Sequence, residues 1–353
     1  MIYINGRFLT HHIAGIPRFS YEMCRAMSRS GMAITVVAPF DTPRKDYPFP
    51  VEYYGKRKSH LWEQVDLYCF MKRKNGALLI SFSGLGPVLY KNHLPTIHDL
   101  SFWRYPEWFS FSYTLVYKIL TPILARKAVS VLTVSQFSKN EIVDLLKIKE
   151  DKVAVIPDAV PPELCPKQNE TDRNNPEWKE RYVLMVSARD RRKNFSRTVE
   201  AFLSLNLENI KLYIVGDSGT VFKEKGMIDF HHPSIKLLGR VSDEDLSFYY
   251  RRAVFFAYPS MYEGFGLPPI EAMAQGCPVL ASDIEPLREV CGEAAYYCNP
   301  KDTSSIAEGM KTLLTDNALR QHLIKAGYRQ IKNYDWELST QKIQTLLAKI
   351  GYL

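Results

Sequence analysis

Residues 262–283, YEGFGLPPIEAMAQGCPVLASD, place glycines, prolines and two glutamates around the expected start of a helix. The apolar run Val254–Ala257 comes shortly before this segment and predicts a buried strand. Glu263–Leu267 is therefore expected to be a strand-to-helix loop, in which Gly264 and Gly266 allow the backbone to approach a ligand closely. A strand, a glycine-containing loop and a helix in this order are typical of a parallel α/β sheet.

The two glutamates of this segment lie on either side of the expected helix start. Pro268 and Pro269 suit the first turn of a helix, whose free N–H groups and dipole attract an anion. The carboxylates of Glu263 and Glu271 can each accept paired hydrogen bonds from a vicinal diol of a ribose or a sugar ring. A solvated loop acid and a partner for the helix dipole would also explain two glutamates. The neighbouring glycines, prolines and strand favour a site for a phosphate that carries sugar rings.

A second loop, in the segment MVSARDRRKNF of Met185–Phe195, is strongly basic. It follows an apolar run that predicts the first strand of a second α/β half. Its four cations are Arg189, Arg191, Arg192 and Lys193. Several cations at the carboxyl end of a strand can neutralise a diphosphate, and an arginine can do so with two parallel hydrogen bonds. A basic surface loop without a ligand is the alternative interpretation.

Short apolar runs alternate with helical patterns along the whole chain. Strands are expected at Ile2–Ile4, Ile34–Ala38, Ala77–Ser81, Thr96–His98, Val131–Val134, Val153–Ile156, Tyr182–Ser187, Lys211–Val215, Ile235–Leu238, Val254–Ala257 and Val279–Ala281. Helices are expected at Pro17–Ser28, Ser138–Leu146, Asn194–Leu205, Asp243–Arg251, Pro269–Gln275, Thr303–Leu314, Asn317–Asn333 and Glu337–Lys349. Ser138 and Glu141 fit a capping box at the start of one of these helices. The alternation predicts parallel sheets that helices cover on both faces.

The segment Val160–Trp178 is rich in Pro, Asn and charge, and it is the expected linker between two domains. We therefore expect an N-terminal Rossmann-like domain at residues 1–165 and a C-terminal one at 166–353, facing each other across a cleft. The final helix, 337–349, is amphipathic and is free to pack back on the first domain. In open parallel sheets ligands bind outside the carboxyl ends of the strands.

Composition and charge narrow the class of protein. The chain has 353 residues, of which 46% are hydrophobic and 24% charged, as in ordinary globular proteins. It has no apolar stretch of about 18 residues and no signal-peptide pattern, and its six cysteines form no CxxC pair. Reduced thiols and a cytoplasmic location are therefore expected. Residues 1–165 carry 21 Lys and Arg against 14 Asp and Glu, so this half holds most of the positive charge. Such a half attracts anionic surfaces, although a solvated surface explains the charge equally well.

Two further positions in the N-terminal half are candidate site residues. His98 lies at the expected end of a strand, where it can donate a hydrogen bond to a sugar oxygen or transfer a proton. Gly15 lies between the first strand and its helix. A lone His is most often structural, and a single glycine is weak evidence. No GxGxxG follows the first strand, which argues against a dinucleotide oxidoreductase.

These segments together resemble the retaining glycosyltransferases of family 4, which have the GT-B fold. The residues that match the Glu-x7-Glu signature are Glu263 and Glu271, and the resemblance implies that they contact the donor sugar and the ribose. The arginine-lysine-asparagine motif is matched by Arg192, Lys193 and Asn194, although Ser187 and Ala188 stand where many members have glycine and threonine. The resemblance implies further donor-binding residues, which are Gly15, His98, Arg240, Val241, Gly264, Phe265, Gly266 and Leu267. It implies a catalytic role for His98, Arg192, Lys193 and Glu263.

The resemblance also implies a reaction and its partners. It predicts metal-independent transfer of a hexosyl unit, with retention, from a nucleotide sugar to a hydroxyl of a glycan or a lipid-linked acceptor. The subgroup that the chain most resembles makes surface polysaccharides with mannose donors, so GDP-mannose is the favoured donor. One alternative is a transferase that uses a UDP-sugar, and the other is a non-catalytic module that binds a nucleotide sugar. We expect no cofactor, no metal and no nucleic acid.

A lipid-linked acceptor requires the N-terminal half to meet a membrane. The segment Phe109–Val129 is dense in apolar and aromatic residues and carries Lys118, Arg126 and Lys127. Pro122 interrupts it, so a bent helix or two short helices are expected. Together with the basic clusters at 56–58 and 72–74 it predicts peripheral attachment to anionic lipid on the inner face of the plasma membrane. A helix of the protein core is the alternative.

Overall fold

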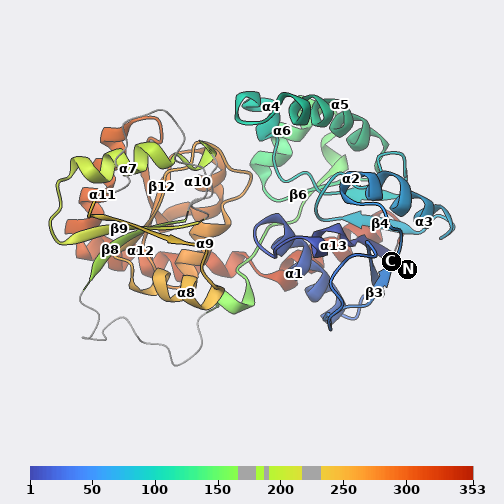
Figure 1. The fold of residues 1–353 in the computed structure, drawn as a ribbon, viewed down its shortest axis with the longest axis horizontal. Coiled ribbons are helices and arrows are strands. Elements are labelled where there is room, and N and C mark those ends of the chain that lie inside the picture. The colour runs from blue at the N-terminus through green and yellow to red at the C-terminus, as the bar shows by residue number, and fades with distance from the viewer. Residues whose placement is uncertain (166–179, 187–190, 217–231, 353) are drawn as a thin grey trace. The chain divides into compact units, whose positions relative to one another are not determined.

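The structure is a computed structural model that describes residues 1–165, 180–186, 191–216 and 232–352. The chain forms two compact units (Figure 1). Unit 1 comprises Met1–Ala159 together with Tyr334–Leu353, and unit 2 comprises Val160–Asn333. Most of the expected linker, residues 166–178, lies outside the described residues. None of the described helices is long and apolar enough to cross a membrane.

Unit 1 is built on parallel strands. They are β1 (Ile2–Asn5), β2 (Ile34–Ala38), β3 (Val51–Tyr53), β4 (Leu78–Ser81), β5 (His93–Pro95), β6 (Val131–Thr133) and β7 (Val153–Val155). The first five form a sheet in the order β3-β2-β1-β4-β5, and β6 pairs with β7. Thr96 bridges to Leu132, which connects the end of β5 to β6. The central strands β1 and β4 are buried along their whole length, as expected for a parallel sheet covered on both faces.

The helices of unit 1 come from both ends of the chain. They are α1 (Ile16–Arg29), α2 (Ser59–Leu61), α3 (Tyr68–Lys72), α4 (Ser101–Arg104), α5 (Phe111–Lys127), α6 (Gln136–Leu146) and α13 (Trp336–Lys349). The last helix packs on α1, and the ring of Trp336 lies 6.0 Å from that of Phe19. Ser339 also donates a hydrogen bond to the carbonyl of Pro157. Residues 334–353 therefore belong to unit 1. The sequence-based boundary counts them with the second domain but leaves helix 337–349 free to pack back on the first, as it does.

Unit 2 contains a second parallel sheet. Its strands are β8 (Arg181–Val186), β9 (Ile210–Val215), β10 (Ile235–Gly239), β11 (Phe255–Tyr258), β12 (Val279–Ser282) and β13 (Ala295–Cys298), and its helices are α7 (Phe195–Ser204), α8 (Asp243–Arg252), α9 (Leu267–Ala274), α10 (Glu285–Cys291), α11 (Thr303–Thr315) and α12 (Asn317–Gln330). The spatial order is β10-β9-β8-β11-β12-β13. This is the doubly wound order of dinucleotide-binding folds, and it reverses direction between β8 and β11.

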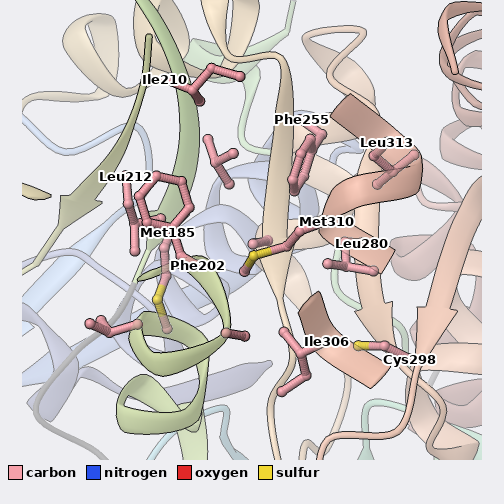
Figure 2. Packing of buried hydrophobic residues seen from close by; sticks show 14 of the residues in the cluster. Met185, Phe202, Ile210, Leu212, Phe255, Leu280, Cys298, Ile306, Met310 and Leu313 are labelled. Atoms are coloured by element: carbon pink, nitrogen blue, oxygen red, sulfur yellow. The ribbon is translucent and has the colours of Figure 1, made fainter. Parts of the chain in front are cut away.

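Alternate residues of the unit 2 strands point to opposite faces of the sheet. Val183, Met185 and Phe255 pack with residues of α7 and α11, such as Phe202 and Met310 (Figure 2). The neighbouring residues on the same strands face the other side, where α8 and α9 contact β8, β11 and β12. Helices on both faces explain why these strands are almost continuously apolar. The predicted α/β class with two parallel-sheet domains is confirmed.

Several sequence-based boundaries differ from the structure. Ser135, not Ser138, caps α6, because its hydroxyl accepts from the Ser138 N–H. The expected strand at Thr96–His98 lies three residues earlier, because His93–Pro95 pair with β4 whereas Thr96 already turns to Leu132. Pro122 lies inside the single helix α5, so the alternative of two short helices is wrong, and the residues Leu124 and Ala125 of the turn that follows the proline are buried. The strands β3 and β13 were not expected from the apolar pattern of the sequence.

Candidate functional site

The carboxyl ends of β8 and β11 are the point where the strand order of unit 2 reverses. The 3-10 turn Arg191–Lys193 follows β8, and the loop that leads to α9 follows β11. Because the two strands are neighbours, their loops meet: the Met261 N–H donates to the Arg192 carbonyl over 2.7 Å. This reversal point is the common ligand site of open α/β sheets.

Lys193 and Glu263 form a buried ion pair at this point. The distance from Lys193 Nζ to Glu263 Oε1 is 2.8 Å, and the two side chains are 14% and 7% exposed. Tyr258, the last residue of β11, donates its hydroxyl hydrogen to the same oxygen over 2.8 Å. Lys193 also contacts the Tyr258 hydroxyl, and its Nζ lies 4.6 Å from the centre of that ring. The cluster thus joins one cation, one anion and one neutral donor.

The charges around Glu263 keep it ionised. Burial alone would raise the pKa of this carboxyl, but Lys193 and Arg192 outweigh burial and hold the pKa below its usual value. Burial and the adjacent Glu263 raise the pKa of Tyr258 well above its usual value, so its hydroxyl stays protonated and remains a donor. Arg192 therefore acts on both Glu263 and Tyr258 electrostatically, and its expected role at a phosphate stays a prediction.

Asn194 fixes the two loops to each other. It is buried, has a left-handed backbone conformation with φ of 55°, and starts α7. Its side-chain amide donates to the carbonyls of Pro259, over 2.9 Å, and Pro300, over 2.6 Å. The asparagine of the three-residue motif thus connects the loop after β8 to the loops after β11 and β13.

The glycine loop after β11 leads directly into α9. The helix begins at Leu267, two residues earlier than expected, and Pro268 and Pro269 are its second and third residues. Because prolines have no N–H, the second and third residues of the helix supply no donor. Gly266 has a φ of 112°, and a Cβ there would lie 2.5 Å from the Leu287 side chain. The start of α9 therefore offers fewer N–H donors than a usual helix N-terminus.

Glu271 lies further along α9 and is held by a different tyrosine. The Tyr250 hydroxyl of α8 donates to Glu271 Oε2 over 3.2 Å, and Glu271 is 7% exposed. Phe256 of β11 lies between the two tyrosines, with its ring centre 5.2 Å from Tyr250 and 5.6 Å from Tyr258. Each of the two signature glutamates thus accepts a hydrogen bond from a tyrosine, and the two tyrosines both pack against Phe256.

The remaining predicted residues of the C-terminal half are not part of this cluster. Arg240 and Val241 follow β10, at the same edge of the sheet but two strands away from β8. Ser187, Ala188 and Arg189 lie outside the described residues. Within the described part of the chain, no group of three or more His, Cys, Asp or Glu side chains is arranged to hold a metal ion.

Gly15 and His98 lie together within unit 1. Gly15 precedes the first turn of α1 with a φ of 54°, and Phe19 of that turn packs edge-on against the His98 ring at 5.2 Å. Burial lowers the pKa of His98, so its ring is neutral at neutral pH. Its Nε2 lies 2.8 Å from the Phe82 carbonyl, which fixes the proton on Nε2. The other ring nitrogen, Nδ1, therefore carries no proton and can accept a hydrogen bond from a ligand.

Sequence reasoning missed Tyr250 and Tyr258. Tyr258 ends the apolar run of β11, and Tyr250 lies in a largely polar helix, α8. At both positions an aromatic residue is expected to pack rather than to hold a carboxylate. The signal that could have found Tyr258 is its place as the last residue of the strand before the Glu263 loop. The structural role of Asn194 was also not foreseen, because its carbonyl partners are 65 and 106 residues away.

Comparisons with known proteins match both units of the chain. Residues 13–164 match the family model described as Glycosyltransferase Family 4. Residues 167–330 match the model described as Glycosyl transferases group 1. Among solved structures, the fold is similar to a sucrose-phosphate synthase from Thermosynechococcus elongatus, with a TM-score of 0.79 at 20% identity over 99% of this chain and 98% of that one. It is also similar to HepE of Anabaena, solved with UDP and glucose, with a TM-score of 0.78 at 17% identity over 99% of each chain.

Relatives with more similar sequences are named as mannosyltransferases. O-antigen chain mannosyltransferase B of Escherichia coli is 30% identical over 271 residues, which are 72% of this chain and 71% of that protein. O-antigen chain mannosyltransferase RfbU of Salmonella typhimurium is 29% identical over 265 residues, 74% of this chain and 70% of that protein. The chain therefore belongs to the group 1 glycosyltransferases of family 4 and has their GT-B fold.

Proposed function

We propose that this glycosyltransferase moves a mannosyl unit from GDP-mannose to a hydroxyl of a glycan or a lipid-linked acceptor during synthesis of a surface polysaccharide. The observation that carries the proposal is the buried Lys193–Glu263 pair at the strand reversal of unit 2. The names of the relatives, which include O-antigen mannosyltransferases, support mannose and polysaccharide synthesis. A UDP-sugar donor is the alternative, since HepE was solved with UDP-glucose.

The residues of the cluster have separable roles in this reaction. Cleavage of the bond between sugar and diphosphate leaves positive charge on the sugar and negative charge on the leaving group. Arg192 and Lys193 stabilise the leaving diphosphate, and Glu263 orients the sugar and faces its developing positive charge. Glu271 accepts from the ribose hydroxyls, and Gly264–Leu267 approach the sugar and the phosphates. Arg240 and Val241 are proposed to contact the base, and Gly15 and His98 the donor from unit 1.

Glu263 is better suited to electrostatic stabilisation than to nucleophilic attack. Both Lys193 and Tyr258 donate hydrogen bonds to its Oε1, and its pKa is held low. A carboxylate that is stabilised in this way is a weak nucleophile. We assign no other carboxylate as a nucleophile and propose that transfer retains the anomeric configuration without a metal ion.

A panel of nucleotide sugars tests the donor assignment. GDP-mannose is expected to raise the melting temperature more than UDP-glucose, UDP-galactose or GDP alone at equal concentration, because a ligand stabilises by mass action in proportion to its affinity. Transfer of radiolabelled mannose to a lipid-linked glycan extract is the matching activity assay. A larger rise in melting temperature with a UDP-sugar would contradict the assignment of GDP-mannose and make that UDP-sugar the donor. Binding without transfer to any acceptor would support a non-catalytic module.

We further propose that unit 1 attaches to anionic lipid through the first turns of α5. Phe111, Leu115 and Ile119 are 82%, 48% and 52% exposed and follow one another at i, i+4 and i+8, on one side of the helix. The helix contains no acidic residue and carries Lys118, Arg126 and Lys127. An apolar stripe with basic residues is typical of helices that lie in a membrane interface.

The two basic clusters contribute less charge to such a surface than the sequence suggests. Arg57 pairs with the largely buried Asp66 over 2.5 Å, and Lys58 lies 3.9 Å from Asp41. Lys74 lies 3.6 Å from Glu52. Each unpaired Lys or Arg near a membrane adds about 1 kcal/mol. The proposal therefore depends mainly on α5 and its own cations.

Co-sedimentation of the full chain with phosphatidylglycerol vesicles tests this attachment. We expect sedimentation at low salt that falls at high salt, because counterions screen the lipid charge. Phe111→Asp with Ile119→Asp is expected to abolish it, since two charges replace the apolar stripe. Leu338→Asp, at an exposed apolar residue of α13, is the matched control and should sediment like the wild type. No sedimentation of the wild type at low salt, or equal loss with Leu338→Asp, would contradict the proposal.

A further inference from the structure

Two buried tyrosines each hold one of the two signature glutamates. Tyr258 donates to Glu263 over 2.8 Å, and Tyr250 donates to Glu271 over 3.2 Å. Both tyrosine side chains are 2% exposed or less. Burial and the adjacent carboxylates raise the pKa of both tyrosines well above its usual value. Each hydroxyl therefore keeps its proton at any physiological pH and can only serve its carboxylate as a donor.

The contacts of Glu263 distinguish its two oxygens. Among the described residues, the side-chain hydrogen bonds and the ion pair of Glu263 all go to Oε1, from Lys193 and Tyr258. A carboxylate has about four lone-pair positions over its two oxygens, so Oε2 keeps its capacity to accept. Anchoring one oxygen fixes the direction in which the other points. A carboxylate that must meet a sugar hydroxyl or a developing charge gains from such fixation, because no reorganisation is needed when the ligand arrives.

We infer that Tyr258 and Tyr250 are positioning residues with different duties: Tyr258 directs Glu263 Oε2 at the donor sugar, and Tyr250 holds Glu271 for the nucleoside. This inference rests on the proposed roles of the two glutamates. Tyr258 acts where charge develops, so its loss affects the chemical step and the recognition of the sugar. Tyr250 acts on a part of the donor that does not react, so its loss affects affinity alone.

Tyr258→Phe and Tyr250→Phe form a matched pair for the test. Each removes one buried hydroxyl and keeps the ring, so packing against Phe256 is preserved and each variant controls for the other. For Tyr258→Phe we expect kcat to fall about tenfold, the size of one hydrogen bond to a charged group, with an almost unchanged Kd for GDP. For Tyr250→Phe we expect the Kd for GDP to rise about tenfold and kcat at saturating donor to stay near that of the wild type.

A binding measurement tests Tyr258 without any transfer. The ratio of the Kd for GDP to the Kd for GDP-mannose reports what the sugar contributes to affinity. Tyr258→Phe is expected to lower this ratio several-fold, whereas Tyr250→Phe weakens both ligands equally and leaves the ratio unchanged. If a UDP-sugar proves to be the donor, UDP and that sugar nucleotide replace the two probes.

The pH profile of kcat supplies a readout that a structural role would not change. The described charged and titratable groups that act on Glu263 are Lys193, Arg192 and Tyr258. The Tyr258 hydrogen bond is one of the contacts that lower the pKa of Glu263, so its removal raises that pKa. Activity that needs an ionised Glu263 is lost as the pH falls through this pKa. The acidic limb is therefore expected to move to higher pH in Tyr258→Phe and to stay in place in Tyr250→Phe.

The outcomes separate this inference from the proposed function. Equal effects of the two variants on kcat and on the Kd for GDP, with an unmoved acidic limb, would overturn the division of duties while wild-type transfer stands. A change in GDP affinity from Tyr258→Phe without a change in kcat would overturn the assignment of Tyr258. A wild type that binds no sugar nucleotide and transfers no sugar would instead refute the proposed function itself.

Discussion

Replacing Lys193 by alanine is expected to lower kcat by about 100- to 1,000-fold, the usual cost of removing one preorganised group that stabilises transition-state charge. Lys193 is 14% exposed and lies between Glu263 and Tyr258, so water screens its charge little. Its ammonium group gains most when negative charge collects on the leaving diphosphate. The Kd for the intact donor is therefore expected to change much less than kcat, which single-turnover kinetics and a binding titration would show.

The same substitution also affects folding, because it leaves Glu263 buried without its lysine. Breaking a buried ion pair costs up to about 3–5 kcal/mol, although Arg192 and Tyr258 still act on this carboxylate. The kinetics must therefore be measured well below the melting temperature of the variant. Lys211→Ala is the control, since Lys211 pairs with Glu180 at the amino ends of β8 and β9, away from the carboxyl ends where the cluster lies. Near-normal kcat in folded Lys193→Ala would remove Lys193 from the leaving-group site.

Replacing Glu271 by alanine is expected to weaken the binding of the nucleoside diphosphate by about 10- to 150-fold, which corresponds to about 1.5–3 kcal/mol for lost hydrogen bonds to a charged group. Glu271 is 7% exposed, so its bonds to a ribose form in a largely water-free place. Isothermal titration with GDP and with UDP measures the loss. An unchanged Kd for both would remove Glu271 from the donor site.

Glu271→Gln separates this loss of affinity from a loss of stability. Alanine leaves the buried Tyr250 hydroxyl without its acceptor, which costs about 1–3 kcal/mol of folding stability. Glutamine keeps an oxygen for Tyr250 but lacks the charge and the second oxygen. We expect Glu271→Gln to restore most of the melting temperature and little of the affinity. Recovery of both would mean that Glu271 serves the fold rather than the ligand.

The local elements of both units could be predicted from the sequence. The apolar runs of β8, β11 and β12 are continuous, because both faces of a parallel strand are covered. The loop Glu263–Leu267 was predictable because glycines and prolines act on the backbone of their own residues and neighbours. The residue types at the site, two glutamates and a basic loop, were visible for the same reason. Each of these signals depends on neighbours within a few positions along the chain.

Boundaries that depend on distant partners could not be predicted in this way. Both Ser135 and Ser138 suit an N-cap by residue type, and the backbone path into α6 decides for Ser135. His93–Pro95 became the strand because β4 pairs with it. Pro122 leaves a bent helix and two short helices open, and the buried residues Leu124 and Ala125 lie beyond the proline in a single helix, α5. The last helix joined unit 1 because α1 offers it a partner, which its amphipathic pattern does not reveal.

The sequence by itself indicated that glutamates and cations stand in the loops after two strands, and only the tertiary structure decided which of them meet and how they are held. Lys193 and Glu263 are 70 residues apart, and the strand order, which sets β11 next to β8, makes them an ion pair. Tyr250 and Tyr258 read as core aromatics in the sequence, because a pattern of apolar positions records burial but not hydrogen-bond partners. Their partners became known only when the folded chain placed a carboxylate against each hydroxyl. The physical reason is that the burial of a side chain can be predicted from the periodicity of its neighbours in the sequence. The pairing of charges depends instead on which strands the sheet places side by side.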